Sequence, residues 1–411
     1  MNLFNISWKN LWGRPFSTLI SLMLLVLSVS IISLLLLLNQ QLDQQFKKNI
    51  KGIDMVIGAK GSPLQLILSA VYHIDNPTGN IPLEEANRFR KHPLVKQSIP
   101  LAYGDNYKGY RILGTETTYI DHYGGELAEG KIWEKPMELT IGSSVAETMN
   151  LKVGQEIVSS HGLIDDVTGH DDAPFTIVGI LKPSGTVLDQ MMLGAIESVW
   201  LIHDEGHEEE EAEEEGETQD HEGEAEHAEE DREITALLIT YRSPMAMVQL
   251  PSLINQGTSM MAAVTAIEVN RLFELFAVGI STLRAIAIAI MVISIISVLF
   301  SLYNSLRDRT YELALMRSLG ASRWRLFWLI LLEGGVLALM GYVLGMMVSR
   351  GGMALIANFI AENYRYDFPV FEFLEAELWL LPITLGLGLL AALLPAWKAY
   401  ETDISKTLAE G

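Results

Sequence analysis

The sequence predicts an α-helical membrane protein with four transmembrane helices and an α+β domain carried on a two-helix stalk between spans one and two. Three observations lead to this fold class. Hydrophobic residues make up 49% of the 411-residue chain, and they gather in four runs that carry almost no charge. The long segment between the first two runs is more polar and is punctuated by turn residues. Amphipathic helical patterns stand at both ends of that segment.

The four apolar runs are long enough to cross a bilayer. The first contains no charged residue, and at ~1.5 Å per residue it reaches about 35 Å, against a hydrocarbon core of roughly 30 Å. The predicted spans are residues 16–38, 285–306, 326–349 and 378–397, with Glu333 as their one charged residue. No small-residue cleavage site follows the first run, so we expect an uncleaved signal anchor.

Lysine and arginine near the span ends predict the orientation, because cytoplasmic loops are enriched in these residues. Segment 307–325 carries five arginines, whereas connection 350–377 carries more acidic than basic residues. We therefore expect segment 307–325 and both termini in the cytoplasm, with residues 1–15 as an amphipathic helix and residues 398–411 as a tail. Segment 39–284 and connection 350–377 would lie outside.

The outer segment, residues 39–284, reads as a folded domain on two stalk helices. Leu42, Phe46 and Ile50 repeat every four residues after span one. A second helical stripe precedes span two and consists of Val269, Leu272, Phe273, Phe276 and Ile280. Between these helices, short β-type runs such as YRILGT and FTIVGIL alternate with turn signals. We expect these helices and strands to form an α+β domain.

Residues 203–233 form an acidic insertion. They hold 18 acidic residues and one arginine, so most of the formal net charge of −22 falls here. Without apolar residues the segment cannot offset its ordering entropy, and we expect a disordered loop. Its four histidines are His203, His207, His221 and His227. Two interpretations stay open: a solvated spacer, or weak multivalent capture of a divalent metal such as Zn²⁺.

The arginine-rich segment between spans two and three has its own local pattern. Helix formers run from Thr310 to Leu319, Gly320 is expected to end that helix, and Ser322 is expected to cap the next one. The five arginines alone would fit a loop whose only role is to set the membrane orientation.

The order of several motifs along the chain indicates a resemblance to a known family. RTYELALMRSLGAS resembles the cytoplasmic coupling segment of MacB/FtsX-type ABC transporter permeases, which typically reads RxxEIGxLRAxGAS. Further segments resemble the same family in the same order, namely IGSSVAETMNLKVGQEI, FTIVGILKPSGTVLDQMM, LLEGGVLALMGYVLG and LLPAWKAYETDISKTLAEG. The resemblance covers essentially the whole chain. Ala314 departs from the family's usual glycine, and the acidic insertion is not a general family feature.

The resemblance implies a permease in the bacterial inner membrane with a periplasmic domain and a homodimeric assembly. In this family the coupling segment docks into a cleft on a separate cytoplasmic ABC ATPase subunit, and the residues that would make the contact here are Arg309, Glu312, Leu313, Met316, Arg317, Leu319 and Gly320. ATP would bind the partner alone, because GIDMVIGAKGS lacks the spacing of a phosphate-binding loop. Further expected contacts are membrane lipid and, as a candidate, a periplasmic protein; no nucleic acid is expected.

Two functions stay open. In the first, the permease transmits ATPase motion to the periplasmic domain and moves or extracts a substrate, with a link to zinc through the acidic loop as a further hypothesis. In the second, nothing is transported, and the domain regulates a periplasmic partner such as a cell-wall hydrolase. We expect no enzyme activity and no catalytic residues, because no nucleophile elbow, HExxH or carboxylate pair is found. His73 and Asp75 form a weak candidate metal pair against ordinary core packing.

Overall fold

The computed structural model describes most of the chain, namely Ser7, Phe371 and residues 15–159, 174–202, 232–364 and 373–401. The described chain divides into two compact units. Unit 1 comprises residues 1–43 and 275–411, and unit 2 comprises residues 44–274. Unit 1 is built from long apolar helices, and unit 2 is a mixed α/β domain inserted between the first two of them. The predicted fold class is confirmed.

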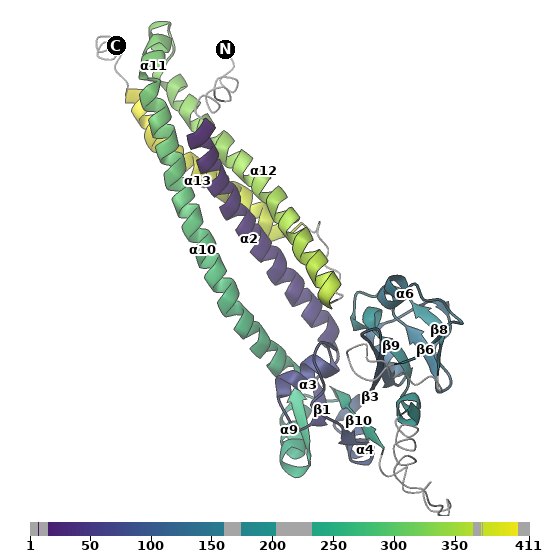
Figure 1. Cartoon of the computed structure of the whole chain (residues 1–411). Coiled ribbons are helices and arrows are strands. Elements are labelled where there is room, and N and C mark those ends of the chain that lie inside the picture. Colours follow the sequence, from purple (N-terminus) through teal and green to yellow (C-terminus); the bar gives the residue numbers. More distant parts are fainter. Residues whose placement is uncertain are drawn as a thin grey trace, which may run out of the picture. The chain divides into compact units, whose positions relative to one another are not determined.

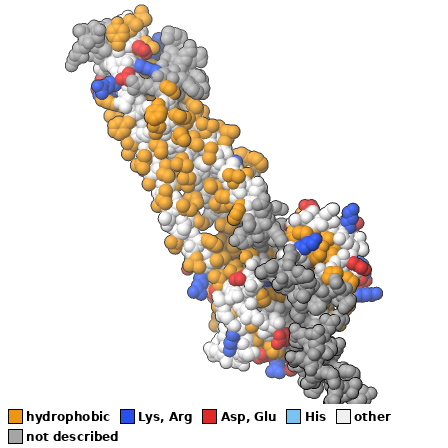
Figure 2. Space-filling view, in the orientation of Figure 1, with side chains coloured by type: hydrophobic (Ala, Val, Ile, Leu, Met, Phe, Trp, Pro, Cys, Tyr) orange, Lys and Arg blue, Asp and Glu red, His pale blue; other side chains and the backbone are white. Residues whose placement is uncertain are grey.

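Four helices in the described part of the chain are long and apolar enough to cross a membrane (Figure 1). They are α2 (Pro15–Ile50), α10 (Thr265–Asp308), α12 (Arg323–Tyr364) and α13 (Glu375–Glu401). Each contains one predicted span. Hydrophobic side chains cover most of the visible face of unit 1, and charged side chains gather at the end that carries the short helix α11 (Thr310–Ser318) (Figure 2).

Two predicted segments fall mainly outside the described residues. Of the expected amphipathic helix at residues 1–15, only Ser7 and Pro15 are described. Of the expected tail at residues 398–411, only the first four residues are described, and they continue α13.

Glycines set the distance between α12 and α13. A Cβ on Gly388 would lie 2.4 Å from the Cβ of Ala338, and a Cβ on Gly334 would lie 2.5 Å from the Cβ of Ala392. Both distances are shorter than any real contact between such atoms, so neither position accepts a side chain without movement of a helix. Small residues at such crossings are typical of helices that pack in lipid, where close van der Waals contact replaces the hydrophobic effect.

Serines line the seam between α2 and α10. Ser17 Oγ donates to Ser301 Oγ at 3.1 Å, and the hydroxyls of Ser21 and Ser297 are 2.8 Å apart. Hydrogen bonds of this kind between membrane helices contribute about 0.6 kcal/mol each. They also show that the two helices run antiparallel, because rising residue numbers on α2 meet falling numbers on α10.

A buried ion pair joins α2, α12 and α13. Arg350 donates to both carboxylate oxygens of Glu377, at 3.1 and 2.6 Å, and Glu377 is only 1% exposed. Ser33 Oγ of α2 donates to the same carboxylate at 2.5 Å and pairs with Ser349 Oγ at 2.9 Å. The backbone N–H of Leu374 donates to it as well, at 3.2 Å. A carboxylate with four donors is well compensated, whereas loss of the arginine would leave a buried charge.

Unit 2 is built on a ten-stranded mixed sheet. The strand order is β12-β1-β11-β3-β4-β9-β6-β8-β5, with β7 paired to β8, and β10 forms a separate ribbon with β2. The strands are β1 (Met55–Ala59), β2 (Ile81–Pro82), β3 (Val95–Tyr107), β4 (Tyr110–Thr115), β5 (Leu127–Gly130), β6 (Glu138–Ile141), β7 (Glu156–Ile157), β8 (Phe175–Leu181), β9 (Met192–Ala195), β10 (Glu233–Ile234), β11 (Ala236–Tyr241) and β12 (Met260–Val264). The helices are α3 (Pro63–Ala70), α4 (Leu83–Arg90), α5 (Thr118–Tyr123), α6 (Ser143–Met149) and α9 (Ala246–Gly257), with a 3₁₀ turn at Val187–Gln190.

Both faces of the central strands are covered. Successive side chains of a strand point to opposite faces, and in β11 Leu238 joins one hydrophobic cluster while Leu237 and Ile239 join another. In β1, Val56 and Met55 divide in the same way. Because both faces are covered, the sequences of β1 and β11 are largely apolar and do not alternate between apolar and polar residues.

The edge strand β12 is closed by a side chain. The amide of Asn255, on α9, accepts from the N–H of Ala262 at 2.7 Å and donates to its carbonyl oxygen at 3.3 Å. Those are the two bonds that a neighbouring strand would make. The asparagine therefore protects part of an edge that would otherwise be open to pairing with another strand.

The described residues on either side of the acidic insertion are held together by Trp200. Its indole N–H donates to the carbonyl oxygen of Glu233 at 2.8 Å, and the guanidinium of Arg232 lies 4.9 Å from its ring centre. The predicted loop, with its four histidines, lies outside the described residues except for Arg232 and Glu233, and Glu233 belongs to strand β10.

Candidate functional site

The arginine-rich segment forms a helix between two turns. Helix α10 ends at Asp308, Arg309 breaks the helical path, and α11 starts at Thr310. The Thr310 hydroxyl donates to the carbonyl oxygen of Arg307, and the N–H of Leu313 donates to the carbonyl oxygen of Arg309 at 3.0 Å. The first bond uses a carbonyl group that the end of α10 would otherwise leave without a partner, and the second is the first backbone bond of α11.

The turn after α11 has the geometry expected from its sequence. Gly320 has a φ of +98°, its N–H donates to the carbonyl oxygen of Arg317, and the N–H of Ala321 donates to that of Met316, both at 3.0 Å. This is the Schellman arrangement, which needs a residue with positive φ at that position. The Ser322 hydroxyl then accepts from the N–H of Arg325 at 3.3 Å and caps α12. Both predicted caps are confirmed.

One face of α11 is buried in unit 1. Leu313 is 4% exposed and Ala314 is fully buried. The hydrophobic cluster around Leu313 draws on the ends of α10, α12 and α13 and contains Leu306, Leu326, Leu329, Ile330, Ala396 and Ala399, with Met316 and Phe327 partly buried against it. At roughly 2–3 kcal/mol for a fully buried leucine side chain, this contact is what holds a nine-residue helix in place.

The opposite face of α11 is open. Leu319 is 81% exposed, and Tyr311 and Leu315 are about half exposed, so a stripe with a four-residue repeat lies on the surface. Glu312 and Gly320 are exposed beside this stripe.

The seven predicted contact residues therefore differ in their exposure to the surface. Glu312, Leu319 and Gly320 lie on the surface, while Arg309, Met316 and Arg317 are partly buried. Leu313 points into the cluster. Sequence reasoning missed Tyr311 and Leu315, although their spacing to Leu319 at i, i+4 and i+8 was the signal that places them on one face.

Aromatic side chains surround the same end of unit 1. The ring of Trp324 is 5.4 Å from that of Tyr400, which stacks on Trp397 at 5.8 Å. The guanidinium of Arg323 lies 5.9 Å from the Tyr400 ring, and Trp328 is exposed nearby in the chain. Tryptophan and tyrosine gather where a membrane meets water, because each ring has an apolar body and a polar tip. The arrangement indicates that the membrane–water interface lies at the level of these rings.

The last residues of α2 belong to unit 2 and pack within it. The Phe46 ring meets the rings of Tyr72 and Phe273 edge-on at 4.7 and 5.5 Å. Lys48 Nζ donates to the carbonyl oxygen of Ser184 at 2.7 Å, and Asn49 Oδ1 accepts from the N–H of Val187 at 3.3 Å. Since Phe273 belongs to α10, one aromatic cluster holds the domain ends of both long helices.

The loop that receives α2 is itself braced by a buried carboxylate. Asp189 is 8% exposed and accepts from the N–H groups of Ser184 and Gly185 at 2.8 and 2.6 Å, and from the Ser184 hydroxyl at 2.9 Å. Gly142 lies against this turn, where a Cβ would come within 2.1 Å of the Leu188 carbonyl oxygen. These contacts brace the loop that the last residues of α2 contact within unit 2.

The predicted metal ligands are the four histidines of the acidic insertion. His203, His207, His221 and His227 lie outside the described residues. Within the part of the chain that is described, no group of three or more His, Cys, Asp or Glu side chains could hold a metal ion.

His73 has both ring nitrogens in contact with phenols. Nδ1 pairs with Tyr103, whose hydroxyl donates onward to the Ser69 carbonyl oxygen, so Nδ1 must be the donor. Nε2 lies 2.8 Å from the Tyr119 hydroxyl and accepts from it. A neutral imidazole satisfies every group in this network. Burial, and secondarily the charge of Arg111, lower the pKa of His73 to about 3. Asp75 is not part of this network.

Two family models match the chain. Residues 18–244 match the MacB-like periplasmic core domain, and residues 284–404 match the FtsX-like permease C-terminal model. A relative, the ABC transporter permease YtrF of Bacillus subtilis strain 168, is 24% identical over 152 residues, which cover 34% of this chain and 34% of that protein. The chain thus spans about a third of that relative's length.

Two solved structures are also similar. The periplasmic region of MacB from Actinobacillus actinomycetemcomitans is 12% identical with a TM-score of 0.35, and the match covers 56% of this chain and 98% of that one. The extracellular domain of the noncanonic ABC-type transporter YknZ from Gram-positive bacteria is 14% identical with a TM-score of 0.30, and the match covers 51% and 98%.

The His73 network predicts a loss of stability in mild acid. Between pH 6.5 and 3 the unfolded chain binds a proton at His73 and the folded chain does not, so stability falls as the pH decreases through this window. The expected loss between pH 7.5 and pH 5 is up to about 2 kcal/mol. Urea unfolding of unit 2 in the full chain, followed by pulse proteolysis at several pH values, measures it.

The control for this prediction is His73→Asn, which does not titrate and tolerates the positive φ of 56° at this position. Burial also lowers the pKa of His122, so the variant should lose only part of the pH dependence. Equal slopes for the variant and the parent chain would contradict the assignment.

Proposed function

Because this chain belongs to the family of FtsX-like permeases with a MacB-like periplasmic core domain, we propose that it is the membrane subunit of an ABC transporter driven by a separate ATPase subunit. It transmits the motion of that ATPase to unit 2, which moves or extracts a substrate. The ATPase supplies the catalytic step, and this chain supplies none. Two copies of the chain assemble with two copies of the ATPase.

The observation that carries the proposal is the division of α11 into two faces. Leu313 ties the helix to the ends of α10, α12 and α13, so a push on α11 reaches three helices at once. Leu319 and Glu312 remain available on the open face. An exposed apolar stripe beside fixed charges is a surface that suits a protein partner.

The long helices support the second half of the proposal. α2 and α10 each continue without a break from an apolar span to residues that pack in unit 2. The cluster of Phe46, Tyr72 and Phe273 joins their domain ends. We propose that motion at the α11 end passes along these two helices to the domain.

The orientation is part of the proposal, with α11 and both termini in the cytoplasm. Six basic and three acidic side chains lie in residues 301–325 and 395–401, at the end of unit 1 that carries α11. An excess of arginine and lysine in short loops favours the cytoplasmic side.

Cysteine labelling tests this orientation, because the chain has no natural cysteine. In intact spheroplasts, a membrane-impermeant maleimide should label Ser252→Cys, on the exposed face of α9, and should not label Ser322→Cys. After the membrane is permeabilised both should react. Labelling of Ser322→Cys in intact cells would overturn the orientation.

The coupling role predicts that changes on the open face of α11 uncouple the ATPase. Glu312→Lys combined with Leu319→Asp should lower permease-stimulated ATP hydrolysis at least tenfold, because residues at the centre of an interface carry most of its binding energy. Both side chains are exposed, so the melting temperature should not change. Co-purification with the co-expressed ATPase subunit and its hydrolysis rate are the measurements.

Two further variants sharpen the coupling test. Met245→Asp, a similar change at a 60% exposed residue of unit 2, should leave ATPase binding intact. Leu313→Asp buries a charge and should destabilise unit 1 itself. If the Glu312 and Leu319 double variant retains full co-purification and stimulation, α11 is not the docking element.

A zinc-linked role of the acidic insertion is a separate proposal. Its support is compositional: four imidazoles lie among 18 acidic residues in positions 203–233. Imidazole and carboxylate groups both bind Zn²⁺, and such binding weakens as imidazoles take up protons.

Calorimetric titration of the full chain with Zn²⁺ at pH 7.5 tests the zinc proposal. Replacing all four histidines by asparagine keeps every carboxylate and should lower the zinc stoichiometry, and mild acidification to pH 5.5 should do the same in the parent chain. If the histidine-free variant binds as much zinc as the parent chain, the segment is a spacer.

A further inference from the structure

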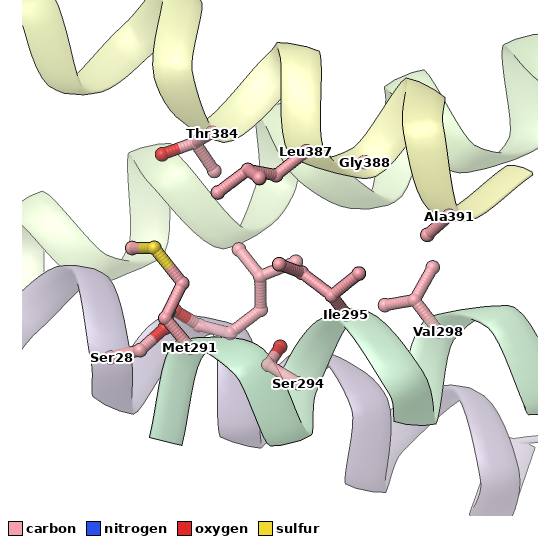
Figure 3. A pocket seen from close by; sticks show the side chains of 10 residues that line it. Ser28, Met291, Ser294, Ile295, Val298, Thr384, Leu387, Gly388 and Ala391 are labelled. Atoms are coloured by element: carbon pink, nitrogen blue, oxygen red, sulfur yellow. Dashed lines mark hydrogen bonds between the residues drawn. The ribbon is translucent and has the colours of Figure 1, made fainter. Parts of the chain in front are cut away.

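A hollow lies in unit 1 where α10 and α13 meet beside α2. Side chains from the three helices face it, among them Met291 and Ile295 from α10 and Leu387 from α13 (Figure 3). These three are partly exposed, so the hollow opens toward the surface of the helix bundle. The surrounding spans are uncharged, which places this surface against hydrocarbon.

The inner wall of the hollow is largely apolar despite its hydroxyl groups. Ser28 Oγ donates to the carbonyl oxygen of Leu25 at 3.0 Å, and Thr384 Oγ1 donates to that of Leu380 at 2.7 Å. Both donors are therefore used within their own helices. Ser294 Oγ has no hydrogen-bond partner among the described residues. The hollow presents one unused hydroxyl and otherwise hydrocarbon.

The same helix pair carries a basic and aromatic cluster at its end. Lys398 Nζ of α13 donates to the Tyr303 hydroxyl of α10 at 2.6 Å and lies 4.5 Å from the centre of its ring. Arg307 follows Tyr303 by one helical turn and is exposed. The phenol and the two cations thus sit where α10 and α13 leave the apolar region.

The cluster and the hollow lie on one line along the seam. Lys398 is eleven residues beyond Leu387, which is about 16 Å along α13 and within about 20° of the same face. Tyr303 is eight residues beyond Ile295, about 12 Å along α10. The hydrocarbon layer of one leaflet is roughly 15 Å deep, half of the bilayer core. The distance from the cations to the hollow matches the depth of one acyl layer.

We propose that the seam between α10 and α13 is a binding site for one anionic phospholipid. The headgroup phosphate pairs with Arg307 and Lys398 and accepts a hydrogen bond from Tyr303, and an acyl chain follows the seam to the hollow beside Met291, Ile295 and Leu387. Charge complementarity selects this occupant, because a cation pair at the depth of the lipid headgroups attracts phosphate. Asp308 and Glu401 are the acidic residues nearest in sequence to the cations, and Glu401 accepts from the Trp397 indole at 2.8 Å.

The test is native mass spectrometry of the full chain in detergent, titrated with phosphatidylglycerol or with phosphatidylcholine of the same acyl chains. The parent chain should bind the first lipid more tightly. Arg307→Gln combined with Lys398→Gln should weaken phosphatidylglycerol binding roughly thirtyfold, about fivefold per charge, and leave phosphatidylcholine unchanged. Tyr303→Phe, which keeps both charges, should give a smaller loss.

A matched control removes two charges from the same end of the bundle. Arg323→Gln with Arg325→Gln changes α12 instead of the seam, and should alter phosphatidylglycerol binding less than twofold. Leu387→Trp, which fills the hollow, should weaken both long-chain lipids and spare dihexanoyl phosphatidylglycerol. Each variant is first checked for an unchanged melting temperature.

Three outcomes would overturn the site. Equal losses in the two double variants would mean a general attraction to the basic end of unit 1. Equal binding of phosphatidylglycerol and phosphatidylcholine by the parent chain would remove the charge selection. Displacement of the lipid by millimolar inorganic phosphate would mean an anion site without an acyl component. None of these outcomes bears on ATPase docking, which is measured separately.

Discussion

A hydrocarbon layer offers no hydrogen-bond partner to a peptide group, and unit 1 is organised by that constraint. Each span must keep its backbone bonds inside one helix, so the polar side chains are left to form the links between helices. Ser17 bonds Ser301, and Ser33 and Arg350 converge on the carboxylate of Glu377. The helices α2 and α10 each continue past the apolar span into residues that belong to unit 2.

The end of unit 1 that carries α11 combines two surfaces within a few turns of helix. One is the exposed stripe around Leu319, directed away from the bundle, and the other is the seam of Tyr303 and Lys398. Leu306, one turn beyond Leu302 in α10, belongs to the hydrophobic cluster around Leu313. The two surfaces therefore share the last turns of α10.

The parts of the structure that sequence predicted were those governed by local or one-dimensional rules. Span positions follow from runs of uncharged residues, and the Gly320 and Ser322 caps follow from the chemistry of single turns. The order of the ten strands could not be predicted, because β11 pairs with β1 and β3 across long stretches of chain. The sequence placed Arg350 and Glu377 in the connection 350–377. Each of them lies directly beside an apolar run, and their charges are opposite.

The candidate site shows the same limit. In a nine-residue helix, both the 311/315/319 stripe and the 313/316 pair are apolar, so periodicity alone does not say which side is buried. Tertiary packing decides it: Leu313 fits among Leu306, Leu326 and Leu329, and the other stripe is left open. The pairing of Lys398 with Tyr303 was equally out of reach, since they lie 95 positions apart.

Trp200 has a consequence for how this domain can diversify. By holding Arg232 and Glu233 beside the end of the preceding segment, it fixes both anchor points of the insertion independently of what lies between them. For a flexible segment closed between two fixed points, the entropy cost grows only with the logarithm of its length, about 0.6 kcal/mol for each doubling. The position therefore suits grafting: a fluorescent reporter with flexible linkers can be inserted between these anchor points with little change in the free energy of folding.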